Sequence, residues 1–244
     1  MIVNVLSHTV LLPILLAQAA YVRRHVIELP EPPGDRSGAV GDGPPLRLLI
    51  IGDSSAAGVG VATQAEALLG RITGRLAGVA RVEFDLVART GAKTAEAVGW
   101  LDDLPSDQYD VVVTALGVND VTKATPLSRW LSLQARLLDR LKNDFGARRI
   151  VVSGLPPMGQ FPLLPQPLRW AMGRRALWFD KHLHRLVAAR PACTPVTIKL
   201  GLNDTNMSAD GFHPGPSVYA AWADEICGVI LSDPGLLDAA RRKA

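Results

Sequence analysis

From Leu46 onward, the chain alternates between short apolar runs and longer stretches with helical periodicity. Strands that are buried on both faces of a parallel sheet give near-continuous apolar runs of this kind, and the intervening helices cover the two faces. The sequence therefore predicts an α/β fold, a three-layer αβα sandwich with a five-stranded, flavodoxin-like parallel sheet. The predicted strands are 46–52, 82–88, 109–117, 148–154 and 195–200.

The chain length of 244 residues suits one such domain, predicted over 46–244. Residues 1–45 precede it as an apolar segment and a Pro/Gly-rich connector. In open parallel sheets, ligands bind beyond the carboxyl ends of the strands. We therefore expect a functional site where the loops GDSSAAG, RTGAK, GVND and SADGFHPG follow their strands or precede a helix.

Ser54 in GDSSAAG is a candidate nucleophile because it lies at a strand-to-helix turn, where the helix N-terminus favours developing negative charge. A phosphate-binding turn is the alternative, since flavodoxin-like folds bind phosphate at this place. The loop has no lysine at the position of a P-loop lysine, and Asp53 would repel a phosphate. The turn alone does not decide between the two.

Asp210 and His213 are three residues apart, which allows the carboxylate to accept a hydrogen bond from one imidazole nitrogen while the other faces outward. A lone histidine is usually a surface residue or a satisfied core residue, and this is what we expect of the other four, which are His8, His25, His182 and His184. A serine hydrolase also needs donors for an oxyanion. The side chain of Asn119 and a backbone N–H at Gly91 are the candidates, although an Asn after a strand is most often a turn former.

Taken together, four motifs resemble the signature blocks of the SGNH hydrolases, also called GDSL esterases/lipases. They are Gly52 to Ser54, Gly91, Gly117 to Asp120 and Asp210 to His213, and the resemblance covers about residues 46–232. The stretch before the domain, LLAQAAYVRRH followed by LPEPPGDRSG, resembles a bacterial esterase/lipase branch of this family. Ser55 stands where many members have Leu, at a position that varies within the family.

The resemblance implies that Ser54 attacks an ester carbonyl, that His213 is the general base and acid, and that Asp210 orients His213. The backbone N–H groups of Ser54 and Gly91 and the side chain of Asn119 would form the oxyanion hole. An acyl-enzyme on Ser54 is the expected intermediate, and no metal or organic cofactor is implied.

The apolar residues expected near this rim favour an acyl chain over a sugar, because sugar sites need more hydrogen-bonding groups. The predicted substrate-binding residues are Val118, Met158, Phe161 and Phe212. A serine esterase or lipase acting on a small-molecule or lipid ester is therefore predicted. The alternatives are a carbohydrate O-deacetylase or acyl thioesterase of the same fold and, from another class, a non-enzymatic anion- or nucleotide-binding module.

The first 22 residues carry no formally charged side chain and are followed by Arg23 and Arg24. Export is disfavoured because the positive region of a signal peptide would precede the apolar stretch. The stretch is marginal as a membrane span, which leaves a helix at the membrane surface or a helix packed on its own domain. A cytoplasmic or peripherally membrane-associated protein is favoured.

Composition argues against nucleic-acid binding. The net charge is only +3, the basic residues are spread along the chain, and aromatic residues make up 5%. Cys193 and Cys227 are the two cysteines, and neither lies in a metal-binding spacing. Whether they pair is left open by the sequence.

Overall fold

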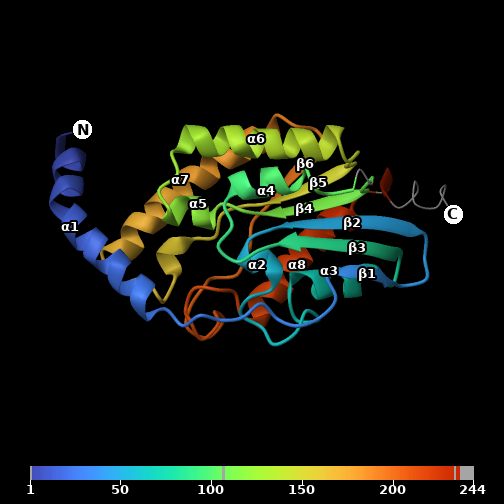
Figure 1. Ribbon diagram of the computed structural model, residues 1–244, viewed down its shortest axis with the longest axis horizontal. Coiled ribbons are helices and arrows are strands. Elements are labelled where there is room, and N and C mark those ends of the chain that lie inside the picture. The colour runs from blue at the N-terminus through green and yellow to red at the C-terminus, as the bar shows by residue number, and fades with distance from the viewer. Residues whose placement is uncertain (1, 106–107, 234, 237–244) are drawn as a thin grey trace.

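The computed structural model describes residues 2–105, 108–233 and 235–236. Its centre is one sheet with the strand order β1-β3-β2-β4-β5-β6 (Figure 1). The strands from β2 to β6 pair in parallel, whereas β1 runs antiparallel to β3. The bounds are β1 Ser37–Val40, β2 Pro45–Gly52, β3 Arg81–Ala88, β4 Val111–Ala115, β5 Arg149–Ser153 and β6 Cys193–Val196.

The prediction of a parallel α/β sandwich is confirmed, but the predicted number of five strands is wrong because the described sheet has six. The additional strand β1 comes from the segment predicted to be a connector. All four of its residues are exposed, so it has no buried face and leaves no apolar run in the sequence. β1 forms by backbone pairing with β3, in a register that places Gly38 opposite Phe84.

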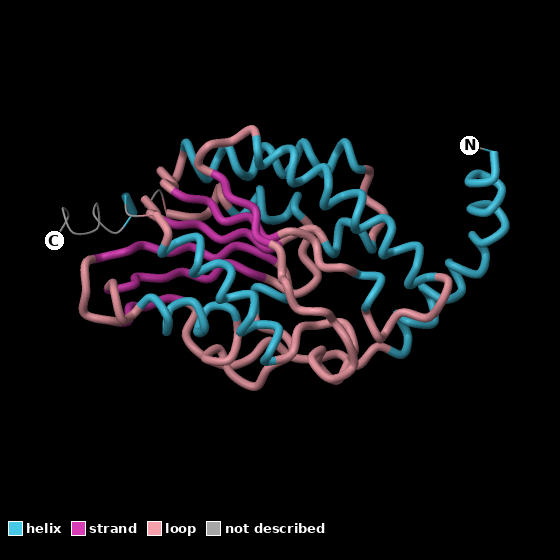
Figure 2. The backbone as a smooth tube through the Cα atoms, turned by 180° about the vertical axis from the view of Figure 1, so that it is seen from behind, coloured by secondary structure: helices cyan, strands magenta, loops and turns pink. Residues whose placement is uncertain are grey.

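Helices cover both faces of the sheet (Figures 1 and 2). One layer contains α3 (Leu68–Leu76) and α8 (Pro216–Leu231), and the other contains α4 (Thr94–Trp100), α6 (Leu127–Asn143) and α7 (Leu168–Ala188). The short elements α2 (Ser54–Ala57), α5 (Val118–Thr122) and η1 (Met158–Gln160) follow β2, β4 and β5. This arrangement leaves the loops after the strands together at one edge of the sheet.

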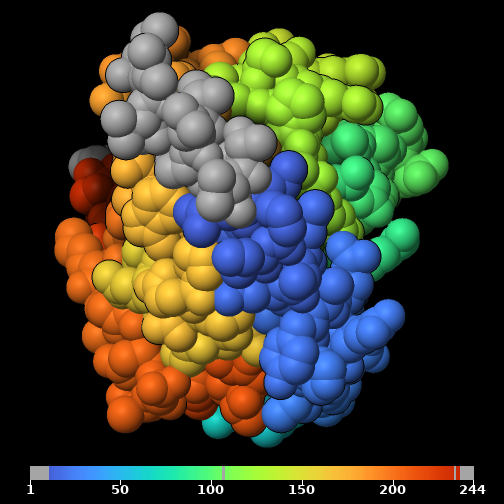
Figure 3. All heavy atoms as spheres, turned by 90° about the vertical axis from the view of Figure 1, so that its left-hand side faces the viewer, coloured from blue at the N-terminus to red at the C-terminus, as the bar shows by residue number. Residues whose placement is uncertain are grey.

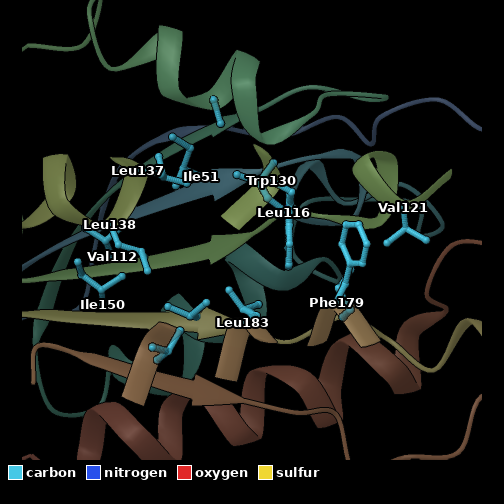
Figure 4. Packing of buried hydrophobic residues seen from close by; sticks show 14 of the residues in the cluster. Ile51, Val112, Leu116, Val121, Trp130, Leu137, Leu138, Ile150, Phe179 and Leu183 are labelled. Carbon is cyan, nitrogen blue, oxygen red and sulfur yellow. The ribbon is translucent and has the colours of Figure 1, made fainter. Parts of the chain in front are cut away.

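Alternating side chains of the strands fill two cores, one on each face. Leu49 and Ile51 of β2 pack with α4, α6 and α7, whereas Leu48 and Ile50 pack with α3 and α8. Figure 4 shows the first core, in which Trp130 of α6 and Phe179 of α7 lie with ring centroids 4.9 Å apart. Burying a Leu or Ile of this kind contributes about 1.5–3 kcal/mol relative to exposure. The two cores therefore hold the carboxyl ends of the strands in place, and these ends position the polar loops that follow them.

The N-terminal helix α1 (Ile2–His25) projects at one end of the molecule (Figure 1). Its Leu15 and Val22 pack on the core beside α7. Gln18 donates to the carbonyl of Gln166 at 2.6 Å and accepts from the N–H of Leu168 at 3.0 Å. Among the described residues, no helix has the length and apolar character needed to cross a membrane.

The segment after α1 lies against the body of the protein. Glu31 accepts from the backbone N–H of Thr90 at 2.8 Å and pairs with Arg36 at 2.9 Å. These bonds and the pairing of β1 hold residues 31–40 along β3. The boundary at 45/46 stays a prediction, and the last residues of the range 46–244 lie outside the described part of the chain.

Both cysteines are free thiols. Cys193 lies in β6, and Cys227 lies in α8, packed in the core on the other side of the sheet from α7. Burial raises the pKa of each thiol to about 11. Both groups are therefore protonated at neutral pH, and neither is poised for thiolate chemistry.

Candidate active site

Ser54 lies in a turn that only glycine at position 52 permits. A Cβ atom on Gly52 would stand 2.6 Å from the carbonyl oxygen of Ala115 and would also collide with Ala56. Asp53 caps α2, because its Oδ1 accepts from the backbone N–H of Ser55 at 3.0 Å and from the Ser55 hydroxyl at 2.8 Å. Ser54 is consequently held as the first residue of α2, with 6% of its surface exposed.

His213 and Asp210 meet Ser54 at this turn, although Ser54 and His213 are 159 positions apart in the sequence. The Nε2 atom of His213 lies 2.9 Å from the Oγ atom of Ser54, and its Nδ1 atom lies 2.5 Å from Oδ2 of Asp210. These contacts form a continuous chain from hydroxyl to imidazole to carboxylate. An arrangement of this kind can take a proton from the serine as its oxygen attacks an electrophile.

Asp210 is organised to remain charged. Its Oδ1 atom accepts from the Ser208 hydroxyl at 2.7 Å and from the backbone N–H groups of Phe212 and His213, each at 2.9 Å. Burial would raise the pKa of Asp210, but the hydrogen bonds from His213, Ser208 and Phe212 outweigh that effect and hold the pKa below its usual range. The carboxylate can therefore fix the orientation of the His213 ring and stabilise a positive charge on it.

Gly91 and Asn119 lie on either side of Ser54, after the two strands that flank β2. Gly52 at the end of β2 pairs with Ala88 of β3 and with Ala115 of β4, so the three following loops emerge together. Gly91 has a φ of +78°, a conformation that favours glycine. The Nδ2 atom of Asn119 in α5 lies 3.5 Å from Oδ2 of Asp53. Both predicted oxyanion donors thus come from loops adjacent to Ser54.

Asp120 and Lys123 position these loops, and the sequence analysis gave neither a role. Buried Asp120 accepts from the N–H of Thr94 at 3.0 Å and from its hydroxyl at 2.8 Å, which ties α5 to the start of α4. The Lys123 ammonium donates to the carbonyl oxygen of Gly91 at 2.7 Å. Asp120 lies inside the GVND motif, and this position could have indicated a role for it. No sequence pattern indicated a role for Lys123, because lysine is common after a short helix.

A pocket of about 60 Å³ opens beside Ser54, on the side toward β5 and β6. Its walls are mostly apolar, and its few polar groups include Ser153, whose hydroxyl already accepts from the Trp222 indole N–H at 3.1 Å. The apolar lining includes Leu116, Val118, Leu155, Pro156, Phe161, Ile198, Leu202, Met207, Phe212, Val218 and Trp222.

Three of the four predicted substrate-binding residues, Val118, Phe161 and Phe212, line this pocket. Met158 does not: it is fully buried in the core between the sheet and α7. The reason is local, because Met158 begins the 3-10 helix η1, and its chain turns inward against α7 while Phe161 at the end of the same turn reaches the pocket. The apolar character of Met158 and Phe161 alone could not show which of the two side chains faces the pocket and which faces the core.

No group of three or more His, Cys, Asp or Glu side chains within the described residues is arranged to hold a metal ion. The polar groups around Ser54 are the hydroxyl, imidazole, carboxylate and amide groups named above. This set suits attack by a serine on an acyl group and the reverse proton transfer to a leaving group.

A family model of the GDSL-like lipase/acylhydrolase family matches residues 50–221 of the chain. That range contains Ser54, Gly91, Asn119, Asp210 and His213. Among the curated proteins, a sequence search finds no match.

Several solved structures share the fold. TesA is 21% identical with a TM-score of 0.62, covering 78% of this chain and 99% of its own. The esterase EstA from Pseudoalteromonas sp., solved with monoethylphosphonate as inhibitor, is 18% identical with a TM-score of 0.59, covering 76% and 97%. A carbohydrate esterase family 2 enzyme from Corynascus thermopiles is 14% identical with a TM-score of 0.62, covering 79% and 68%. At these identities the likeness concerns the fold.

Proposed function

The chain belongs to the GDSL-like lipase/acylhydrolase family, and from this premise we propose that it is a serine esterase acting on carboxylic esters with a short acyl chain. The observation that carries the proposal is the 2.9 Å contact of Ser54 Oγ with His213 Nε2, continued by the contact of His213 Nδ1 with Asp210. A binding module for anions or nucleotides would have no use for this chain of contacts, and Asp53 and Asp210 would repel its ligand.

In the proposed reaction, His213 accepts the Ser54 proton while Oγ forms a bond to the ester carbonyl carbon. The bond to the alkoxy oxygen then breaks, and His213 returns the proton to the leaving alcohol. Water attacks the resulting acyl-enzyme with His213 again as base, releasing the carboxylic acid and restoring Ser54. Asp210 keeps the Nδ1 proton of His213 in place during both halves.

The surroundings of Ser54 suggest how the ester lies. The carbonyl oxygen would point toward the loops of Gly91 and Asn119, where N–H groups can stabilise the negative charge of the tetrahedral intermediate. The acyl chain would enter the apolar pocket on the opposite side, toward β5 and β6. A cavity needs about 10–15 Å³ of volume of this kind to hold one water molecule. The pocket of about 60 Å³ therefore has room for an acyl chain of only a few carbon atoms.

We expect the highest kcat/KM among p-nitrophenyl esters for butyrate or hexanoate, with acetate and dodecanoate both poorer. Ile198→Ala, which removes side-chain atoms from the pocket wall and so enlarges the pocket, should shift the preference toward esters with longer acyl chains. Val79→Ala, at an exposed valine remote from the pocket, is the matched control and should leave the profile unchanged. The panel includes acetylated sugars and acyl thioesters. Faster turnover of either class than of any p-nitrophenyl ester would replace the proposed substrate with that class.

Asn119→Ala should lower kcat by about 100-fold to 1,000-fold and change KM little, because an oxyanion donor acts mainly in the transition state. The control is Asn143→Ala at the exposed end of α6, which should have no effect on kcat. Thermal melts of both variants accompany the kinetics. If Asn119 is only a turn former, its variant will melt earlier while the folded fraction keeps the wild-type kcat.

A further inference from the structure

The outward face of α7 carries large apolar side chains that are exposed to solvent. Trp170, Leu177 and Trp178 are exposed by 40%, 64% and 53%. Residues at these spacings fall on one side of an α-helix, opposite the buried Ala176, Phe179 and Leu183. The three side chains therefore form part of a single stripe along the helix. Trp170 and Trp178 contact Arg174 and His182 of the same helix, and much of their surface stays exposed.

Basic side chains interrupt the same stripe. Arg174, Lys181 and Arg185 are exposed, and helical spacing places them between and beyond the apolar residues. Asp180 is the one acidic residue in the sequence of α7, and it turns inward, where its carboxylate accepts from the Leu155 N–H at 2.8 Å. The stripe is thus both apolar and uniformly positive.

Helix α1 continues this surface. Its Leu12, Ile14, Leu16 and Tyr21 are exposed by 47–62%, with Leu12 and Leu16 on one side of the helix and Ile14 and Tyr21 on the other. Arg23 and Arg24 lie in its last turn. Figure 3 shows α1 and α7 side by side on one end of the molecule, and the Gln18 bonds to Gln166 and Leu168 hold the helices together. We call the stripe on α7 together with the exposed residues of α1 the α1–α7 face.

We propose that the α1–α7 face docks on an anionic lipid surface. Helices that lie in the membrane interface combine Trp and Leu with Lys and Arg, because the rings and aliphatic chains enter the headgroup region while the cations meet lipid phosphates. Charge complementarity favours this occupant over a second copy of the chain, since two copies would place like charges opposite one another. The proposal concerns where the protein binds and does not depend on which ester it cleaves.

The test is sedimentation of the full-length chain with vesicles of phosphatidylcholine alone and with added phosphatidylglycerol. Wild-type protein should bind the anionic vesicles preferentially, and added salt should release it. Each cation near an anionic surface contributes about fivefold in partitioning, so combined Arg174→Gln, Lys181→Gln and Arg185→Gln should lower binding by about 100-fold. Combined Trp170→Gln and Trp178→Gln should also reduce it.

The matched control combines Val79→Gln with Arg81→Gln, an exposed apolar residue and an exposed cation outside the α1–α7 face, and should bind like wild type. All variants should hydrolyse a short soluble ester at the wild-type rate, which shows that they are folded. Equal binding to neutral and anionic vesicles would overturn the proposal, as would unchanged binding of the triple cation variant. A concentration-dependent dimer that the Trp variants abolish, without vesicle binding, would assign the face to self-association instead.

Discussion

Replacing Ser54 with alanine is expected to lower kcat for a short p-nitrophenyl ester by about 10⁵-fold to 10⁶-fold, because no acyl-enzyme can form without its hydroxyl. His213→Ala should have an effect of the same order, since nucleophile and base act as one unit. Steady-state kinetics on purified, folded variants measure both losses.

The adjacent serine is the matched control. Ser55 also carries a hydroxyl at the start of α2, but this hydroxyl donates to Asp53 and is not part of the chain to His213. Ser55→Ala should therefore keep most of the activity and lose only what the weakened cap of α2 costs. An active Ser54→Ala enzyme, or an equal loss in both serine variants, would remove Ser54 from its proposed role.

Asp210→Asn should lower kcat by about 10⁴-fold while leaving the loop folded. The amide can still accept the bonds from Ser208, Phe212 and His213 through its oxygen. Its NH₂ group, however, would donate to Nδ1 of His213 and leave the proton on Nε2, which could then no longer accept one from Ser54. Asp204→Asn, an exposed substitution in the same loop region, is the control and should be fully active.

The pH dependence of stability provides a second measurement on Asp210. Its pKa is lower in the folded protein than the value of about 3.9 of an unfolded chain, so its carboxylate contributes stability above that value and loses it as the pH falls through the folded pKa. The stability that Asp210 contributes through its own ionisation is therefore fully present above about pH 5 and is lost below about pH 4. The difference in unfolding free energy between wild type and Asp210→Asn should shrink as the pH falls below about 4, and a difference that stays the same down to the acid unfolding of the protein would contradict this picture of Asp210.

Much of the fold could be predicted because its elements are buried and therefore leave strong patterns. α8 (Pro216–Leu231) is an example, since Pro216 starts it and apolar residues at helical spacing face the core. β2 likewise coincides with the apolar run 46–52, apart from Pro45 at its start. β1 could not be predicted from the sequence, because its four residues are exposed and pair with β3 only through the backbone, which requires no apolar pattern.

In the candidate site, too, some residues could be predicted from the sequence and others could not. Ser54, Asp210 and His213 could be brought together from strand order and motif spacing, because parallel strands deliver their loops to one edge. The contacts of Lys123 with Gly91 and of Asp120 with Thr94 depend on side chains meeting across loops, which no local pattern encodes. Met158 and Phe161 are both apolar and lie three residues apart in one turn. The backbone of that turn directs Met158 into the core and Phe161 toward the pocket, and the sequence pattern does not distinguish these two directions.

The central claim is that Ser54 is the nucleophile activated by His213. It is tested most directly by treating the full-length protein with a fluorophosphonate and measuring its intact mass, followed by peptide mapping. The account predicts one phosphonyl group per chain, located on Ser54, formed much more slowly in His213→Ala and absent in Ser54→Ala. Labelling on another residue, or hydrolysis of the ester that continues while Ser54 is fully phosphonylated, would contradict it.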